Sequence, residues 1–235
     1  MAKVMIDIGH GGSDTGASGN GLIEKDLNLK VGIMLKNYLS RYEVEIRATR
    51  DTDAALSNDV RVELVNSFNP ELCVSVHHNA ASTAEARGAE VIHSHYDEDD
   101  DELTNRILDN MEAIGMPKRR AFTKLNSRGD DWYYMIRRIW DSNTDAIIVE
   151  GGFVTNPTDA ELLKSEDFLM AEAEAIGSAV VEYLGLALIT EKWWDAAMQR
   201  MVAAGLIENE HNGNHAVTWG EFATVMSRLL DKLQL

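Results

Sequence analysis

The 235-residue sequence has one cysteine, three prolines and no long run of apolar residues. A single cysteine excludes a disulfide framework, and Cys73, inside the apolar run 72–76, is expected to be a small buried side chain. No run approaches the roughly 18 apolar residues that cross a bilayer, so we predict no transmembrane segment. The first residues lack the basic segment and cleavage site of a secretory signal, which predicts synthesis in the cytoplasm without a signal peptide.

Basic residues are also scarce, because 22 lysines and arginines stand against 39 acidic residues and give a formal charge of -17. Such a charge repels the phosphates of nucleic acids and of anionic lipid surfaces, so nucleic acid is not expected as a partner. Almost all of the excess negative charge lies before residue 187. The apolar fraction of 45% and charged fraction of 26% are those of an ordinary globular protein.

Short apolar runs alternate with segments of helical periodicity over the first two-thirds of the chain. This pattern predicts an α/β fold, a mostly parallel twisted sheet flanked by helices. The expected strands are residues 3–8, 44–49, 71–76, 89–93 and 146–149. The acidic run 97–102 precedes a predicted helix, whose N-terminus it would favour, and a calcium-binding loop is the alternative.

A helix that ends at Gly185 marks the predicted domain boundary, because glycine suits the residue that follows a helix. Residues 1–186 are then one α/β domain, and residues 187–235 form a small helical domain. The second domain is predicted to contain a helix around Trp193, a polar loop and a helix that begins after the capping pattern of Thr218 and Glu221.

Three polar residues directly follow predicted strands: His10, His77 and Glu150. Because ligands bind outside the carboxyl ends of strands in open α/β sheets, we expect these side chains to meet at one edge. Glycines around His10 permit a sharp turn, and the lysine and glycine spacings of the common phosphate-binding loops are incomplete here. Successive residues of a strand face opposite sides, so only one of His77 and His78 can face a given metal, and alternation does not say which.

Four short motifs occur in the order found in one family of enzymes: residues 7–12, 24–28, 75–79 and 149–153. Through them the chain resembles the zinc N-acetylmuramoyl-L-alanine amidases of the amidase type 3 family over residues 3–184. The resemblance implies a zinc ion held by His10, Glu24 and His77, and Glu150 as the catalytic acid and base. The chain departs from the family pattern at three positions that remove no functional group: Ile8, His78 and Gly151.

Two histidines and one carboxylate leave a zinc position open, which is typical of catalytic rather than structural sites. The resemblance implies that the substrate is bacterial peptidoglycan and that the bond cut joins N-acetylmuramic acid to L-alanine. A zinc peptidase that cuts the stem peptide, and a non-catalytic wall-binding protein, are the alternative hypotheses.

The C-terminal segment resembles a single S-layer-homology motif, through Trp193, Ala197, residues 205–207 and residues 217–223. This resemblance implies binding to a secondary cell-wall polysaccharide, and a helical pair packed on the catalytic domain is the alternative. A wall hydrolase without a signal peptide fits a phage or prophage endolysin that reaches the wall after holin-type release. A sporulation amidase made in the mother cell would have the same sequence features.

Overall fold

The computed structural model describes residues 1–96, 100–140, 144–189, 200–207 and 219–233. Contacts divide the chain into two units, Met1–Leu188 and Ile189–Leu235. The assignment of catalysis to residues 1–186 and of wall binding to residues 187–235 stays a prediction. No helix among the described residues is both long enough and apolar enough to cross a membrane.

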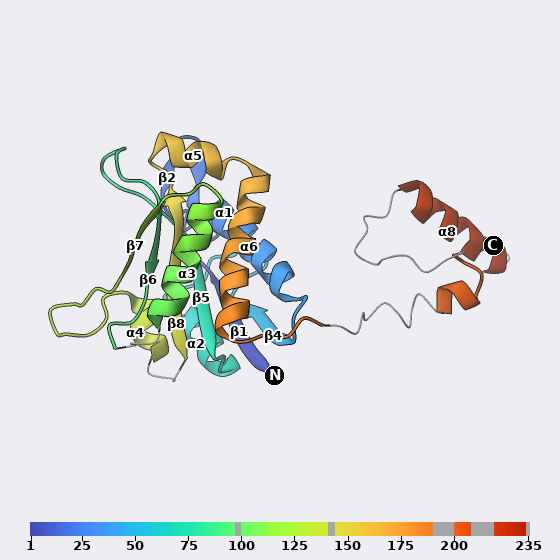
Figure 1. Cartoon of the computed structure of the whole chain (residues 1–235), viewed down its shortest axis with the longest axis horizontal. Helices are drawn as coiled ribbons and strands as arrows, with labels where there is room; N and C mark the ends of the chain where they lie inside the picture. Colours follow the sequence, from blue (N-terminus) through green and yellow to red (C-terminus); the bar gives the residue numbers. More distant parts are fainter. Residues whose placement is uncertain (97–99, 141–143, 190–199, 208–218, 234–235) are drawn as a thin grey trace. The chain divides into compact units, whose positions relative to one another are not determined.

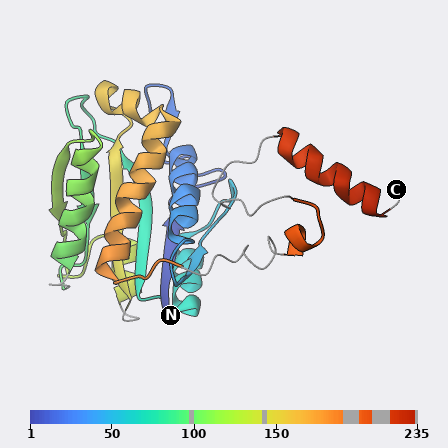
Figure 2. The same cartoon turned by 45° about the vertical axis from the view of Figure 1, so that its right-hand side comes forward.

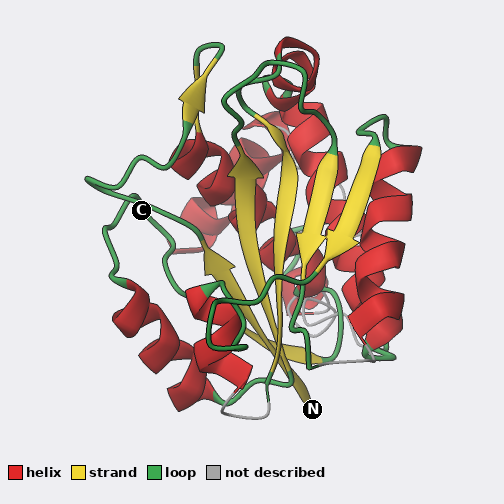
Figure 3. Ribbon diagram, turned by 90° about the vertical axis from the view of Figure 1, so that its left-hand side faces the viewer, coloured by secondary structure: helices red, strands yellow, loops and turns green. Residues whose placement is uncertain are grey.

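The first unit is built on a six-stranded sheet in the order β4-β1-β5-β8-β6-β7. Neighbouring strands run parallel except for β6 and β8, so that β6 and β7 run opposite to the other four strands (Figure 3). The prediction of a mostly parallel α/β sheet is therefore confirmed. The strands are β1 (Ala2–Ile8), β4 (Val44–Ala48), β5 (Leu72–Asn79), β6 (Ala89–Ile92), β7 (Lys118–Phe122) and β8 (Asp145–Phe153).

Helices cover both faces of this sheet. Helices α1 (Glu24–Leu39), α3 (Asp100–Ala113) and α6 (Glu166–Tyr183) pack beside one another on one face (Figures 1 and 2). Helices α2 (Asn58–Phe68) and α4 (Tyr134–Trp140) pack together on the other. The remaining elements are the small strands β2 (Ser18–Gly19) and β3 (Leu22–Ile23), helix α5 (Pro157–Leu163) and, in the second unit, helix α8 (Trp219–Leu233).

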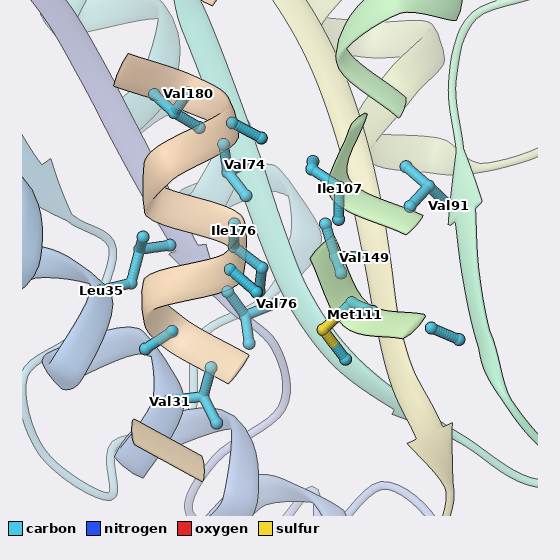
Figure 4. Close-up of a cluster of buried hydrophobic side chains, with 14 of the residues drawn as sticks. Val31, Leu35, Val74, Val76, Val91, Ile107, Met111, Val149, Ile176 and Val180 are labelled. Carbon is cyan, nitrogen blue, oxygen red and sulfur yellow. The ribbon is translucent and has the colours of Figure 1, made fainter. Parts of the chain in front are cut away.

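Alternation along the central strands sorts their side chains between the two faces. Val74 and Val76 of β5 belong to the larger apolar core, where Ile176 of α6 and Leu35 of α1 meet the sheet (Figure 4). Cys73, the residue before Val74, points to the opposite face and belongs to the smaller core beneath α2 and α4. It is buried as expected, and burial raises the pKa of its thiol well above the ordinary value.

Several elements differ from the sequence-based predictions. Strand β7, helices α4 and α5 and the hairpin of β2 and β3 were not predicted, whereas the five predicted strands all occur with ends shifted by a few residues. Residues 97–99 of the acidic run, Trp193 and Ala197 of the predicted tail helix and Thr218 of the capping pattern lie outside the described residues.

Candidate metal centre and active site

The turn after β1 carries His10 in a backbone conformation that side chains rarely adopt. Its φ is 58°, in the left-handed region, and the glycines at positions 11 and 12 also have positive φ. Such a residue costs about 1–3 kcal/mol and persists only where the surroundings hold it. Arg61 Nη2 donates to the His10 carbonyl at 2.7 Å, and Arg50 Nη2 donates to the Gly9 carbonyl at 2.9 Å. The two arginines thus hold the turn.

A buried carboxylate anchors Arg61 in turn. Asp7 accepts hydrogen bonds from Arg61 Nη1 at 2.7 Å, from Ser75 Oγ at 2.6 Å and from Thr49 Oγ1 at 3.0 Å. Burial opposes ionisation of Asp7, but the charge of Arg61 and these hydrogen bonds outweigh it and lower the pKa of the carboxyl. Strands β1 and β5 and the residue that follows β4 are therefore tied to the His10 turn through one ionised side chain.

His10, Glu24 and His77 form a compact cluster at the carboxyl edge of the sheet. One ligand atom from each lies within 4.8 Å of the others, a spacing that suits a shared metal ion. Glu24 Oε1 is 3.1 Å from His10 Nε2 and 2.9 Å from His77 Nδ1. The neighbouring backbone has no room for side chains, since a Cβ on Gly9 would lie 2.2 Å from the His77 ring and one on Gly16 2.5 Å from Glu24 Oε2.

The second nitrogen of His10 and the second oxygen of Glu24 are both held by neighbours. Asp14 Oδ2 lies 2.9 Å from His10 Nδ1, which leaves Nε2 to face Glu24. The amide of Ala17 donates to Glu24 Oε2 at 2.7 Å. A carboxylate behind a histidine orients the ring and fixes its tautomer, as in many zinc sites. This donor set of two imidazoles and one carboxylate fits a zinc ion.

Charges within the cluster shift the pKa values of its members. The hydrogen bond to Glu24 raises the pKa of His10 to about 9, against the effect of burial and with a contribution from Asp14. Burial opposes ionisation of Glu24, but its hydrogen bonds with His10 and His77 dominate and lower its pKa. Without a metal, the cluster therefore holds an ionised carboxylate and a protonated imidazole.

His77 and His78 point to opposite faces of β5, as alternation requires. His77 joins the cluster, whereas His78 is buried on the side of α1 and α6. His78 Nδ1 lies 2.8 Å from Asn28 Oδ1, and His78 Nε2 lies 3.4 Å from Glu172. Asn28 Nδ2 in turn donates to the Gly9 carbonyl at 3.2 Å. The His78 side chain therefore reaches the His10 turn through Asn28, and the His78 backbone amide donates directly to Glu24 Oε1 at 3.3 Å.

Glu150 lies beside His77 because the two residues are paired in register between β5 and β8. Its Oε2 atom is buried and has no hydrogen-bond partner among the described residues. Burial raises the pKa of Glu150 to about 7, with opposing effects from the neighbouring histidines and acids. A carboxyl group that titrates near neutral pH next to a metal cluster suits proton transfer.

Three of the four predicted residues, His10, His77 and Glu150, were predicted from their positions after apolar runs, without reference to a family. His10 follows β1, His77 lies near the end of β5, and Glu150 lies in β8. Glu24 gave no such signal, because it opens a helix. Sequence reasoning also missed Asp14, whose proximity to His10 depends on the tight turn between them.

An α/β sheet that carries two histidines, a carboxylate and a separate buried carboxylate at one edge defines a metal-dependent hydrolase. Comparison with known proteins identifies its kind: residues 4–182 match the Amidase 3 family of N-acetylmuramoyl-L-alanine amidases, and the chain belongs to that family of peptidoglycan hydrolases.

Individual relatives agree with this assignment. The chain is 32% identical over 195 residues to the endolysin of Bacillus phage SPP1, covering 79% of this chain and 68% of that protein. It is 31% identical over 195 residues to N-acetylmuramoyl-L-alanine amidase CwlM of Bacillus licheniformis, covering 79% and 70%. The catalytic domain of the amidase CwlV from Bacillus (Paenibacillus) polymyxa var. colistinus superposes with a TM-score of 0.69 at 25% identity, covering 80% of this chain and all of that domain.

Proposed function

We propose that His10, Glu24 and His77 hold one zinc ion and that Glu150 moves the proton when the amide bond between N-acetylmuramic acid and L-alanine is hydrolysed. The observation that carries the proposal is the buried, unpartnered Oε2 of Glu150 on the strand position beside His77. An unpaired buried carboxylate oxygen costs stability, and a role in proton transfer gives a reason for it.

Zinc in this donor set supplies Lewis acidity toward the amide carbonyl and toward water. The protein contributes orientation: Asp14 holds the His10 ring, Ala17 holds Glu24, and the Arg50 and Arg61 side chains fix the turn. These contacts set the ligand positions before substrate arrives, so little reorganisation is needed during the reaction.

Glu150 acts first as a base and then as an acid in this proposal. Its carboxylate takes a proton from the water that attacks the carbonyl, and the resulting carboxylic acid gives a proton to the departing alanine nitrogen. A pKa of about 7 makes both protonation states accessible near neutral pH. Bound zinc would shift this value downward, because a nearby cation favours the ionised carboxyl.

The Glu150→Gln substitution tests the role of this residue. The variant should bind zinc as the parent does, measured by elemental analysis, and lose about a hundredfold or more of its activity on purified walls, since general acid and base catalysis contributes that much. Glu63→Gln on the exposed surface of α2 is the matched control and should leave activity unchanged. Full activity of the Glu150 variant would remove this side chain from the mechanism.

Mass spectrometry of the released fragments identifies the bond. New amino termini should appear on L-alanine alone, with intact lactyl groups on the glycan. New termini inside the stem peptide would instead indicate a peptidase, and walls that bind the protein but release nothing would indicate a non-catalytic binding protein.

We further propose that the chain acts as a phage or prophage endolysin whose segment 187–235 attaches to a secondary cell-wall polysaccharide. Similarity to the SPP1 endolysin supports the first part. A sporulation-specific amidase of Bacillus subtilis, 28% identical over 193 residues, supports the alternative of a host enzyme. The S-layer-like residues of the tail support the second part.

A further inference from the structure

An open cavity of about 550 Å³ lies on the sheet next to the proposed active site. Strands β5, β6, β7 and β8 and the loop after β7 contribute its walls. The polar and charged residues that line it include Asn79, Glu90, Arg119, Arg120, Lys124 and Tyr133. The mechanism proposed above uses none of these residues.

Strand pairing places one residue of the cavity wall, Glu90, beside Glu150. Glu90 of β6 is paired in register with Glu150 of β8, so the two side chains lie on the same face of adjacent strands. Asn79 Nδ2 donates to Glu90 Oε2 at 2.8 Å and lies two residues beyond His77 on β5. Burial, followed by the charges of Glu150 and Glu90, raises the pKa of Tyr133, which also lines the cavity. Groups next to a bond that is cleaved beside Glu150 can therefore reach this cavity.

A β-bulge concentrates positive charge there. Ala89 pairs with Lys118 and Glu90 with Arg120, so that Arg119 is an extra residue on β7. The bulge allows two consecutive arginines to face the same side chain, since Arg119 Nε and Arg120 Nε donate to Glu90 Oε1 at 2.7 and 2.8 Å. Bulges near active sites commonly redirect a side chain in this way.

Aromatic rings hold the two guanidinium groups in place. Arg120 lies over the Phe122 ring at 4.1 Å from its centroid, and Arg119 lies 5.4 Å from that of Phe153. One buried carboxylate, Glu90, faces two arginines, and Lys124 adds a third cation. The cavity is thus net positive in a chain of charge -17, and each guanidinium uses Nε for Glu90 and keeps its planar Nη edge for another acceptor.

We propose that this cavity binds the free carboxylate of the second residue of the peptidoglycan stem peptide, and the proposal rests on the function proposed above. The glycan of the substrate is uncharged, whereas the peptide joined to it through L-alanine carries free carboxylates. Arginine pairs with carboxylates bidentately, so Arg119 and Arg120 select an anionic peptide over an amidated one.

Two synthetic muramyl tripeptides that differ at one group test this preference. One carries the free carboxylate of its second residue, D-glutamate, and the other carries the carboxamide of D-isoglutamine. The full chain loaded with zinc should cleave the first with about tenfold or higher kcat/KM, the effect expected of a charge-assisted hydrogen bond. Because both substrates share the scissile bond, their ratio is independent of the chemistry at zinc.

The triple variant Arg119→Gln, Arg120→Gln, Glu90→Gln should lose the preference. Glu90 is changed together with the arginines because a buried carboxylate left without them would destabilise the fold. Arg120→Lys should retain part of the preference, since the charge remains and the bidentate geometry is lost. Arg47→Gln, an exposed arginine on the opposite edge strand β4, is the control and should keep the full preference.

Equal cleavage of the two tripeptides by the parent, or an unchanged ratio in the triple variant, would overturn the carboxylate site and leave the amidase function standing. If the parent cleaves neither, the proposed function is at fault, and calorimetry with the Glu150→Gln variant tests the cavity separately. Tighter binding of the carboxylate tripeptide would then support the site, and equal binding would overturn it.

Discussion

At the scale of single residues, His10 combines a strained backbone with a perturbed side chain. Its left-handed φ places the imidazole toward Glu24, and the same contact with Glu24 raises its pKa to about 9. Near neutral pH the metal-free ring is therefore protonated. A metal ion and this proton compete for the same nitrogen, Nε2, which faces Glu24 at 3.1 Å.

Zinc affinity should consequently depend on pH. Between pH 7 and 9 the apparent affinity should rise about tenfold per pH unit, because each zinc ion displaces about one proton from His10. Calorimetry at pH 7 in buffers of different ionisation enthalpy measures the released proton directly. Asp14→Asn should reduce the release because Asp14 helps to raise the pKa, whereas Asp26→Asn, an exposed change on α1, should not. A pH-independent affinity would contradict this account.

Some residues of the site could be predicted from the sequence pattern alone, and others only from the family resemblance. Apolar runs followed by His10, His77 and Glu150 could be recognised because strand ends in an α/β sheet are where ligands gather. Glu24 opens α1, where an acidic residue has an ordinary electrostatic explanation, so only the family resemblance singled it out. The choice between His77 and His78 likewise needed the resemblance, and the structure places only His77 at the cluster.

At the scale of elements, two residues that depart from the family pattern, His78 of β5 and Gly151 of β8, both lie against Glu172 of α6. A Cβ at Gly151 would lie 2.0 Å from Glu172 Oε1 and 3.1 Å from His78 Nε2. The glycine thus makes room for the buried carboxylate that faces His78. Burial alone would lower the pKa of His78, but the charge of Glu172 outweighs it and raises that pKa. The departures at positions 78 and 151 are explained by one shared contact.

Glu172→Gln should therefore destabilise the metal-free protein by about 1–3 kcal/mol, because a buried imidazolium loses its counter-charge. A raised folded pKa stabilises the protein below the unfolded value near 6.5, and this contribution disappears as pH rises through the folded pKa. The loss should thus be larger at pH 6 than at pH 9, measured by denaturant unfolding.

Glu174→Gln, on the exposed side of the same helix, is the matched control and should change stability little at either pH. A loss for Glu172→Gln that is the same at both pH values would show that Glu172 acts through packing rather than through its charge on His78.

The elements that sequence reasoning missed share physical causes. Strand β7 begins with three basic residues and lacks the alternation of apolar and polar residues, so its sequence does not predict a strand. Helices α4 and α5 have seven residues each, too few to show a clear helical period. The bulge that lets Arg119 and Arg120 face the same carboxylate, Glu90, depends on pairing with β6, which the sequence around β7 does not indicate. The cavity was not predicted because β7, which forms one of its walls, was not predicted.

At the scale of the whole molecule, we propose that catalysis and wall attachment belong to different parts of the chain. The buried clusters of the α/β unit lie before residue 189, as do His10, Glu24, His77 and Glu150. Removal of the residues after Leu188 should leave cleavage of soluble muramyl peptides within about twofold of the parent. Binding to sedimented walls should weaken at least tenfold, since the proposed attachment is lost. Unchanged wall binding would contradict a role for the tail.

The full chain and its Glu150→Gln variant test the proposed endolysin role. Bacteria that produce the full chain should lyse only when a phage holin is produced with it, as followed by culture turbidity. The Glu150→Gln variant with the holin is the control for lysis by the holin itself. Lysis without a holin would contradict holin-dependent release and favour another route to the wall.

The basic run on β7 has a consequence for the solution behaviour of the protein. Strand β7 is the last strand of the sheet, and its outer edge presents backbone groups on which a strand of another molecule can pair. A second copy that approached in the antiparallel sense would set Lys118, Arg119 and Arg120 against the same cations. The mutual repulsion opposes such pairing, so the residues proposed to recognise the peptide also disfavour a dimer joined through the β7 edges.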